Sequence, residues 1–240
     1  MKGDDAFGRA LLDWVEVGRA GVVVERDDGF VFQEGGRDFY GAPFRRWEPH
    51  ERRGLRFARG RVLDAGCGSG RVARELQRRG RDVIGIDISP LAIEAARRLG
   101  VRDARVLALA DAGAELGSFD SIVLYGNNLG LLESPAKARR ILRRLQALTS
   151  ARGRIVGSSM DIAAGEDADH RAYVARNVER GRPPGQVRLR VRYRKLIGPW
   201  FDWLFLAKTE LDELLAGSGW RVARSLDAPG DRYVAVIEKD

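Results

Sequence analysis

The sequence predicts an α/β domain built on a doubly wound, mostly parallel sheet. From residue 61 onward, strand-like and helix-like segments alternate, which is typical of a parallel sheet covered on both faces. The last two strand-like segments are separated only by residues 227–232, too few for a parallel crossover, so we expect them to be antiparallel neighbours. The seven strand-like segments are residues 61–66, 82–88, 104–109, 119–125, 153–161, 220–226 and 233–239.

Helices are expected between these strands, through Leu76, over residues 90–99 and over residues 134–149. Thr209 is the predicted N-cap of a last helix that stops at a glycine. Before residue 61, the sequence predicts a helix over residues 5–17, a hairpin turning at Asp28-Gly29, and a helical stretch over residues 43–57. We divide the single domain into an N-terminal cap (1–58), a cofactor-binding core (59–161), a substrate-side insertion (162–207) and a closing helix with a strand pair (208–240).

The insertion is expected to hold a helix over residues 167–180 and a β-hairpin. Its two strands are residues 187–195 and 200–206, and the turn is placed at Leu196–Pro199.

Composition argues against several protein classes. Apolar residues make up 44% of the 240, and no apolar run is long enough to cross a membrane, so no membrane partner is expected. The first ten residues are not those of a secretory signal. A single cysteine, Cys67, rules out an intrachain disulfide and fits a reducing compartment, so we expect a cytoplasmic location.

The net charge of +8 comes entirely from one stretch of the chain. Residues 171–200 carry nine cations and one anion, and in VRLRVRYRK (187–195) apolar residues alternate with cations. A strand with this period places four arginines on one face: Arg188, Arg190, Arg192 and Arg194. Three interpretations remain open: a solvated outer face of an edge strand, pairing with the acidic run Asp161, Glu166, Asp167 and Asp169 or across a dimer, or an anion-binding site.

A glycine-rich turn carries the chemistry. Gly66-Cys67-Gly68-Ser69-Gly70 follows a strand and opens a helix, and Asp87 ends the next strand 21 residues after Gly66. This separation lets an acidic side chain accept hydrogen bonds from ribose hydroxyls. Asp64 would repel a pyrophosphate but suits an ammonium group. The pattern therefore favours S-adenosylmethionine over a nicotinamide dinucleotide.

On these residues the chain resembles the class I S-adenosylmethionine-dependent methyltransferases, over about residues 60–160 and the closing strand pair. The resemblance implies that family's seven-stranded sheet with an antiparallel C-terminal strand. It also implies that Ile88 packs on adenine and that the loop at Asp111-Ala112 contacts the same ring. The cofactor-binding residues it predicts are Asp64, Gly66, Cys67, Gly68, Asp87, Ile88, Asp111, Ala112 and Tyr125.

Two side chains are candidates for the transfer step. His170, past the fifth strand, is a candidate general base, although it also fits a surface histidine beside Asp167 and Asp169. Asn127 follows the fourth strand and either lines the site or forms a turn. Nucleic-acid amine methylases carry (D/N)PP(Y/F) here, which this chain lacks, and the sequence shows no metal-binding cluster.

The leading hypothesis is therefore methylation of an oxygen or nitrogen of a small organic molecule. The aromatics of the insertion would contact the acceptor or a dimer partner, and an N-terminal aromatic group would close over the cofactor. These two groups are Trp200, Phe201, Trp203 and Phe205, and Phe39, Tyr40, Phe44 and Trp47. One alternative is an RNA- or protein-directed methyltransferase that docks through residues 171–195. Another is a non-catalytic cofactor-binding domain. Either a monomer or a homodimer fits the sequence.

Overall fold

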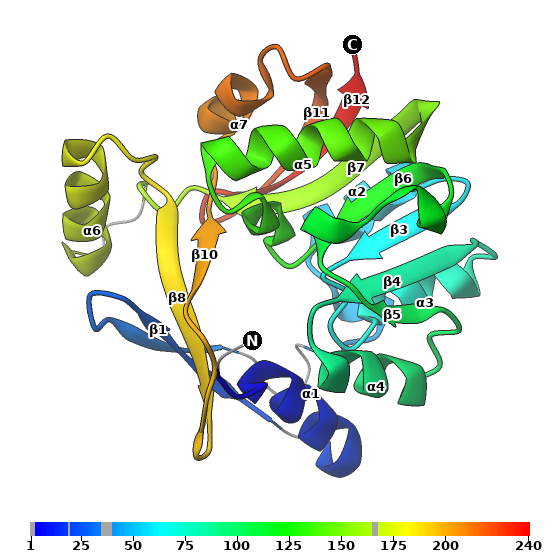
Figure 1. Cartoon of the computed structure of the whole chain (residues 1–240), viewed down its shortest axis with the longest axis horizontal. Helices are drawn as coiled ribbons and strands as arrows, with labels where there is room; N and C mark the ends of the chain where they lie inside the picture. The colour runs from blue at the N-terminus through cyan, green and yellow to red at the C-terminus, as the bar shows by residue number, and fades with distance from the viewer. Residues whose placement is uncertain (1–2, 19, 35–39, 165–167) are drawn as a thin grey trace. The chain divides into compact units, whose positions relative to one another are not determined.

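The computed structural model describes residues 3–18, 20–34, 40–164 and 168–240 (Figure 1). A seven-stranded sheet has the order β11-β12-β7-β6-β3-β4-β5 over these residues. Its strands are β3 (Val62–Ala65), β4 (Val83–Asp87), β5 (Ala104–Val106), β6 (Phe119–Leu124), β7 (Thr149–Met160), β11 (Trp220–Ala228) and β12 (Arg232–Lys239). β4 and β5 pair in parallel, as do β6 and β7, whereas β12 is antiparallel to both β7 and β11. The predicted fold class is confirmed.

Helices lie between the strands, and local sequence sets where they begin. Proline occupies the first turn of both α4 and α5, where its missing N–H removes no helical hydrogen bond. The side chains of Ser89 and Ser134 cap these two helices by accepting from backbone N–H groups three residues on. The α-helices are α1 (Ala6–Val17), α2 (Pro49–Gly54), α3 (Arg71–Arg78), α4 (Pro90–Arg98), α5 (Pro135–Leu148), α6 (Ala168–Glu179) and α7 (Lys208–Leu215). The short 3₁₀ turns are η1 (Phe44–Arg46), η2 (Leu55–Phe57), η3 (Leu109–Asp111), η4 (Ala114–Leu116) and η5 (Asn128–Leu132).

A second sheet, of five strands over the described residues, has the order β10-β8-β1-β2, with β9 paired to β8. β1 (Val22–Arg26) and β2 (Val31–Glu34) form the predicted hairpin. β8 (Gln186–Tyr193), β9 (Leu196–Ile197) and β10 (Phe201–Leu204) come from the insertion. β8 pairs with β1 antiparallel and sets Arg190 opposite Glu25. The sequence gives no sign of this pairing, because strand alternation identifies a face but not a partner.

Two predicted details are wrong, and a predicted helical stretch is divided in the structure. The hairpin after β8 turns at Arg194-Lys195, not at Leu196–Pro199, because Leu196 and Ile197 still pair with β8. The N-cap of α7 is Ala207, not Thr209, because the Glu210 carboxylate accepts from the Ala207 N–H at 2.8 Å and starts the helix earlier. Residues 43–57 are not one helix, because a new helix begins at Pro49 after the turn η1.

The chain forms two compact units. The first comprises Met1–Trp47, Leu63–Leu109 and Arg188–Phe201, and it contains the glycine-rich turn and Asp87. The second comprises Glu48–Val62, Ala110–Val187 and Asp202–Asp240, and it contains Asp111, Tyr125, Asn127 and His170. No helix in the described part of the chain is long and apolar enough to cross a membrane.

Candidate functional site

The glycine-rich turn in the first unit is tightly wound directly after β3. Gly66 and Gly68 have φ values of 70° and 52°, in the left-handed region that favours glycine. The N–H groups of Gly66 and Cys67 both donate to the Ile86 carbonyl, at 2.8 and 3.0 Å. These bonds hold the turn against the end of β4, so the two lie together at the carboxyl ends of β3 and β4.

Two carboxyl groups flank this turn, the buried Asp64 and the half-buried Asp87. Asp64 is 2% exposed and accepts from the Ala73 N–H at 3.0 Å. Asp87 accepts from the N–H groups of Gly68 and Ser89, each at 3.0 Å. Burial raises the pKa of Asp64 to about 7, and it raises the pKa of Asp87 as well. The charge of Asp87 adds to the rise at Asp64. Such a pair of acidic groups favours a cationic ligand and disfavours a phosphate.

Two neighbouring side chains differ in exposure. Ile88 follows the half-buried Asp87 and is 53% exposed, an unusual state for a large apolar side chain. Cys67 is buried, and burial raises the pKa of its thiol well above 9, so it stays protonated and is a poor nucleophile. The glycine-rich turn therefore offers an apolar contact at Ile88 but no thiolate.

Residues before β3 in the first unit contact the glycine-rich turn. A Cβ atom added to Gly68 would lie 3.7 Å from Cδ1 of Leu11 on α1. The Ser69 hydroxyl donates to the carbonyl of Tyr40. Of the N-terminal aromatics, Phe44 and Trp47 lie against arginines at the two ends of α3: Arg79, which caps its C-terminus, is 4.3 Å from the centre of the Phe44 ring, and Arg71 is 4.5 Å from that of Trp47. Phe39 lies outside the described residues.

The second unit contains the other predicted residues. Asp111 ends η3 and is exposed, whereas Ala112 is fully buried. Tyr125 is buried after β6, and its hydroxyl donates to the Glu51 carbonyl at 3.1 Å. Asn127 has a φ of 61°; its N–H donates to the Ser158 hydroxyl at 2.9 Å, and its side chain lies 3.8 Å from the Met160 sulfur. Tyr125 and Asn127 therefore lie together at the carboxyl end of β6.

The two histidines of the second unit lie in different surroundings. His170 lies on α6 and is half-buried. His50 lies in the first turn of α2 and is 4% exposed, and its Nδ1 atom has no hydrogen-bond partner among the described residues. Burial lowers the pKa of His50, so its imidazole is neutral at pH 7. Its helix is bonded to Tyr125 through the Glu51 carbonyl. Sequence reasoning passed over His50, since a histidine after a proline shows no periodic pattern.

The arginine row of β8 is mostly paired with carboxylates. Arg190 and Arg192 both contact Glu25 on β1, at 2.7 and 2.5 Å, and Arg194 contacts Asp13 on α1 at 3.0 Å. Arg188 is exposed. The edge-strand interpretation is wrong, because β8 lies between β10 and β1. Intramolecular pairing is confirmed for three arginines, but with Glu25 and Asp13 rather than the predicted acidic run, of which Glu166 and Asp167 lie outside the described residues.

The aromatics of the insertion pack within their own units. The Arg190 guanidinium lies 4.5 Å from the centre of the Trp200 ring in the first unit. In the second unit, the Trp203 ring lies so close to Gly130 that a Cβ atom there would approach it to 2.1 Å. Within the described ranges, no three His, Cys, Asp or Glu side chains are arranged to hold a metal ion.

Comparisons with known proteins agree with this geometry. Residues 62–153 match the model of a family described as a methyltransferase domain. The chain is 32% identical over 113 residues to a ubiquinone biosynthesis O-methyltransferase of Xanthomonas oryzae, a match that covers 45% of this chain and 46% of that protein. It is 57% identical over 37 residues to a magnesium-protoporphyrin O-methyltransferase of Rhodobacter capsulatus, covering 15% of this chain and 16% of that protein. The matched region thus spans less than half the length of these curated relatives.

Solved structures extend the likeness to nearly the whole chain. An S-adenosylmethionine-dependent methyltransferase from Bacteroides fragilis, crystallised with S-adenosylhomocysteine, is 26% identical with a TM-score of 0.82. That match covers 98% of this chain and 94% of the other. The CcbJ methyltransferase of Streptomyces caelestis shares the fold, with a TM-score of 0.60 at 16% identity over 81% of this chain and 97% of its own. The fold, the glycine-rich turn and the match of residues 62–153 to the methyltransferase-domain family together support a class I S-adenosylmethionine-dependent methyltransferase.

Proposed function

We propose that this protein transfers a methyl group from S-adenosylmethionine to an oxygen or nitrogen atom of a small organic molecule. One observation carries the proposal: two carboxyl groups, the buried Asp64 and the half-buried Asp87, flank a glycine turn beside an exposed Ile88. This arrangement suits a ligand with a ribose, an apolar ring and positive charge, and it does not suit a pyrophosphate.

The residues of the first unit fit this cofactor. Asp87 would accept from the ribose hydroxyls and Ile88 would pack on adenine. The backbone at Gly66 and Gly68, which has no Cβ atoms, would allow close approach, and Asp64 would attract the ammonium group. Asp111 and Ala112 remain the proposed adenine contacts in the second unit. When bound, the cofactor supplies a methyl group already activated by its sulfonium.

The chain must align the acceptor and exclude water, since the methyl donor is already activated. Asn127 and His170 remain proposed acceptor-side residues. His50 joins them as a proton acceptor, because it is neutral, buried and tied through its helix to the end of β6.

Two observations favour a small acceptor. The curated relatives are named as O-methyltransferases of ubiquinone biosynthesis and of magnesium-protoporphyrin. Three of the four arginines of β8 are paired with carboxylates of their own chain, so the proposed docking segment has fewer cations available for phosphates than its sequence suggests.

The test has two parts. Calorimetry with S-adenosylhomocysteine should show binding, and Asp87→Ala should abolish it. A panel of phenols, catechols, amines and carboxylates, assayed with S-adenosylmethionine for release of S-adenosylhomocysteine, should contain an acceptor that is turned over. Binding of the cofactor product without turnover of any acceptor, together with methylation of bulk RNA or protein, would overturn the proposal.

A further inference from the structure

Helix α1 contacts both loops that carry the motif of the first unit. Leu11 lies beside Gly68, as described above, and the Asp5 carboxylate at the start of α1 accepts from the Ser89 hydroxyl at 2.7 Å. Ser89 is two residues past Asp87 and caps α4. The apolar face of α1 packs on α4, beside which it lies in Figure 1, and Leu11 places the helix against the turn. A shift of α1 would therefore move the cover of the glycine-rich turn.

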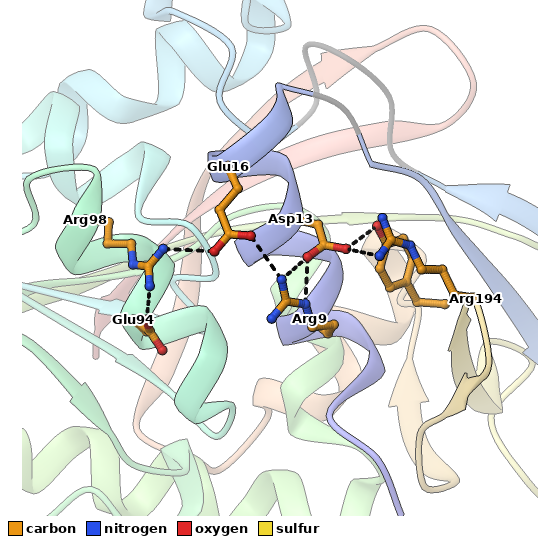
Figure 2. Close-up of polar contacts among 7 residues, drawn as sticks. Arg9, Asp13, Glu16, Glu94, Arg98 and Arg194 are labelled. Carbon is orange, nitrogen blue, oxygen red and sulfur yellow. Dashed lines mark hydrogen bonds and ion pairs between the residues drawn. The ribbon is translucent and has the colours of Figure 1, made fainter.

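Asp13 is a buried carboxylate on the face of α1 that meets the β8–β9 hairpin. It is 3% exposed. The Tyr193 hydroxyl donates to it at 2.8 Å, Arg194 contacts it at 3.0 Å, and Arg9 contacts it from one turn earlier on α1 (Figure 2). Burial would raise the pKa of Asp13, but the hydrogen bonds from Arg9 and Tyr193 outweigh it and keep the pKa below its usual value. Arg9 belongs to α1 itself, so movement of the hairpin would cost the buried carboxylate two of its three partners, Tyr193 and Arg194.

Arg194 reaches Asp13 from an uncommon backbone state. Its φ is 52°, at the first position of the two-residue turn between β8 and β9. Such turns favour asparagine or glycine, since other side chains are strained in the left-handed region. An arginine at this position brings a charged side chain back to α1, which a glycine would not do.

The same network continues from α1 to α4. Glu16 contacts Arg9 at 3.1 Å and Arg98 of α4 at 3.0 Å, and Arg98 also contacts Glu94 within α4 (Figure 2). Glu16, Arg98 and Glu94 are each more than 40% exposed, so these pairs contribute little. Asp13 differs because it is buried. Removing a partner from a buried charge strongly destabilises the folded arrangement around it.

We propose that Asp13 is a positioning residue that couples the β8–β9 hairpin to α1, so that the hairpin controls how firmly α1 covers the glycine-rich turn and holds the cofactor. The inference rests on the proposed function, since that function makes the turn the cofactor loop and the hairpin an acceptor-side element. An acceptor that displaces the hairpin would loosen α1, and an acceptor that orders the hairpin would tighten it.

The experiment measures the dissociation rate of S-adenosylhomocysteine by stopped-flow tryptophan fluorescence, in the full-length chain. Tyr193→Phe and Asp13→Asn should each raise the rate by about five- to twentyfold, because they remove buried contacts. Arg194→Gln should raise it by a smaller factor, about two- to fivefold, because the Arg194 side chain is 67% exposed. Arg194→Lys should restore a rate near that of the unchanged protein. Glu94→Gln is the matched control, because it breaks a charged pair within α4 that does not hold α1, and its rate should stay within about twofold.

Arg194 is 67% exposed, so Arg194→Gln is expected to fold even if Asp13→Asn does not. A melting temperature measured for each variant separates loosened cover from general destabilisation. Unchanged dissociation rates in Arg194→Gln and Tyr193→Phe would overturn the coupling. Failure of the proposed function gives a different result, in which S-adenosylhomocysteine binds but no acceptor is methylated.

Discussion

Asp64→Asn tests whether the buried carboxyl group before the glycine-rich turn serves ligand binding at the expense of stability. Asp64 is 2% exposed, with a hydrogen bond from the Ala73 N–H. Burial raises its pKa from 3.8 to about 7. A difference of this size corresponds to about 4 kcal/mol between its protonated and charged forms.

The sign follows from linkage. The pKa of Asp64 is higher in the folded state than in the unfolded state. The stability that the protonated Asp64 contributes is therefore fully present below about pH 4 and is lost as the pH rises through about 7. Asparagine stays neutral throughout, so Asp64→Asn should be more stable than the unchanged protein at pH 8. The buried amide donors of asparagine cost about 1–3 kcal/mol if they lack acceptors, so we expect a net gain of about 1–3 kcal/mol at pH 8 and none at pH 5.

Binding should change in the opposite direction. Loss of a charged hydrogen-bond acceptor for the ammonium group should weaken S-adenosylmethionine binding by about 10- to 100-fold. Urea unfolding at pH 5 and pH 8 measures the stability, and calorimetry measures the affinity.

Asp120→Asn is the control. Hydrogen bonds from the Arg61 N–H and the Ser150 hydroxyl lower the pKa of Asp120, so this variant should lose stability at pH 8. If Asp64→Asn is less stable than the unchanged protein at both pH values and binds S-adenosylmethionine with the same affinity, the reasoning is wrong.

Three further predictions follow from the site. Asp87→Ala should abolish S-adenosylmethionine binding in calorimetry, because it removes both the ribose acceptor and the bonds from the Gly68 and Ser89 N–H groups; an unchanged affinity would contradict the cofactor assignment. His50 binds a proton near pH 6.5 in the unfolded state, but burial lowers its pKa in the folded state, so the unchanged protein loses stability as the pH falls. Because His50→Asn removes this difference, the variant should gain stability relative to the unchanged protein as the pH falls from 7.5 to 5.5. If the unfolding free energies of the two proteins, measured in urea, change in parallel over that pH range, this prediction is wrong. Tyr125→Phe should lower the unfolding free energy by about 1 kcal/mol, because the Glu51 carbonyl loses one of its donors and keeps the Leu55 N–H; thermal melts would show no change if the bond from Tyr125 contributes nothing.

Several features of the fold could be predicted from the sequence because they depend on residues close together in the chain. The turn at Gly66 and Gly68 follows from residues that tolerate positive φ, and Asp87 follows from its spacing, because one β-α-β unit fixes the distance between successive strand ends. The antiparallel ending follows from the few residues between β11 and β12. None of these features depends on a distant part of the chain.

The remaining features depend on distant parts of the chain. Alternation in β8 predicted which face carries the arginines, but Arg190 meets a carboxylate 165 residues away, and only the pairing of β1 with β8 brings them together. Leu11 over Gly68 and Tyr193 on Asp13 are likewise long-range contacts. The sequence by itself determined the glycine-rich turn, the succession of strands and helices along the chain and the antiparallel ending, since these follow from short-range geometry. Tertiary structure alone decided where the arginines point and what covers the glycine-rich turn, because a charge pattern does not indicate which distant segment of the chain packs against it.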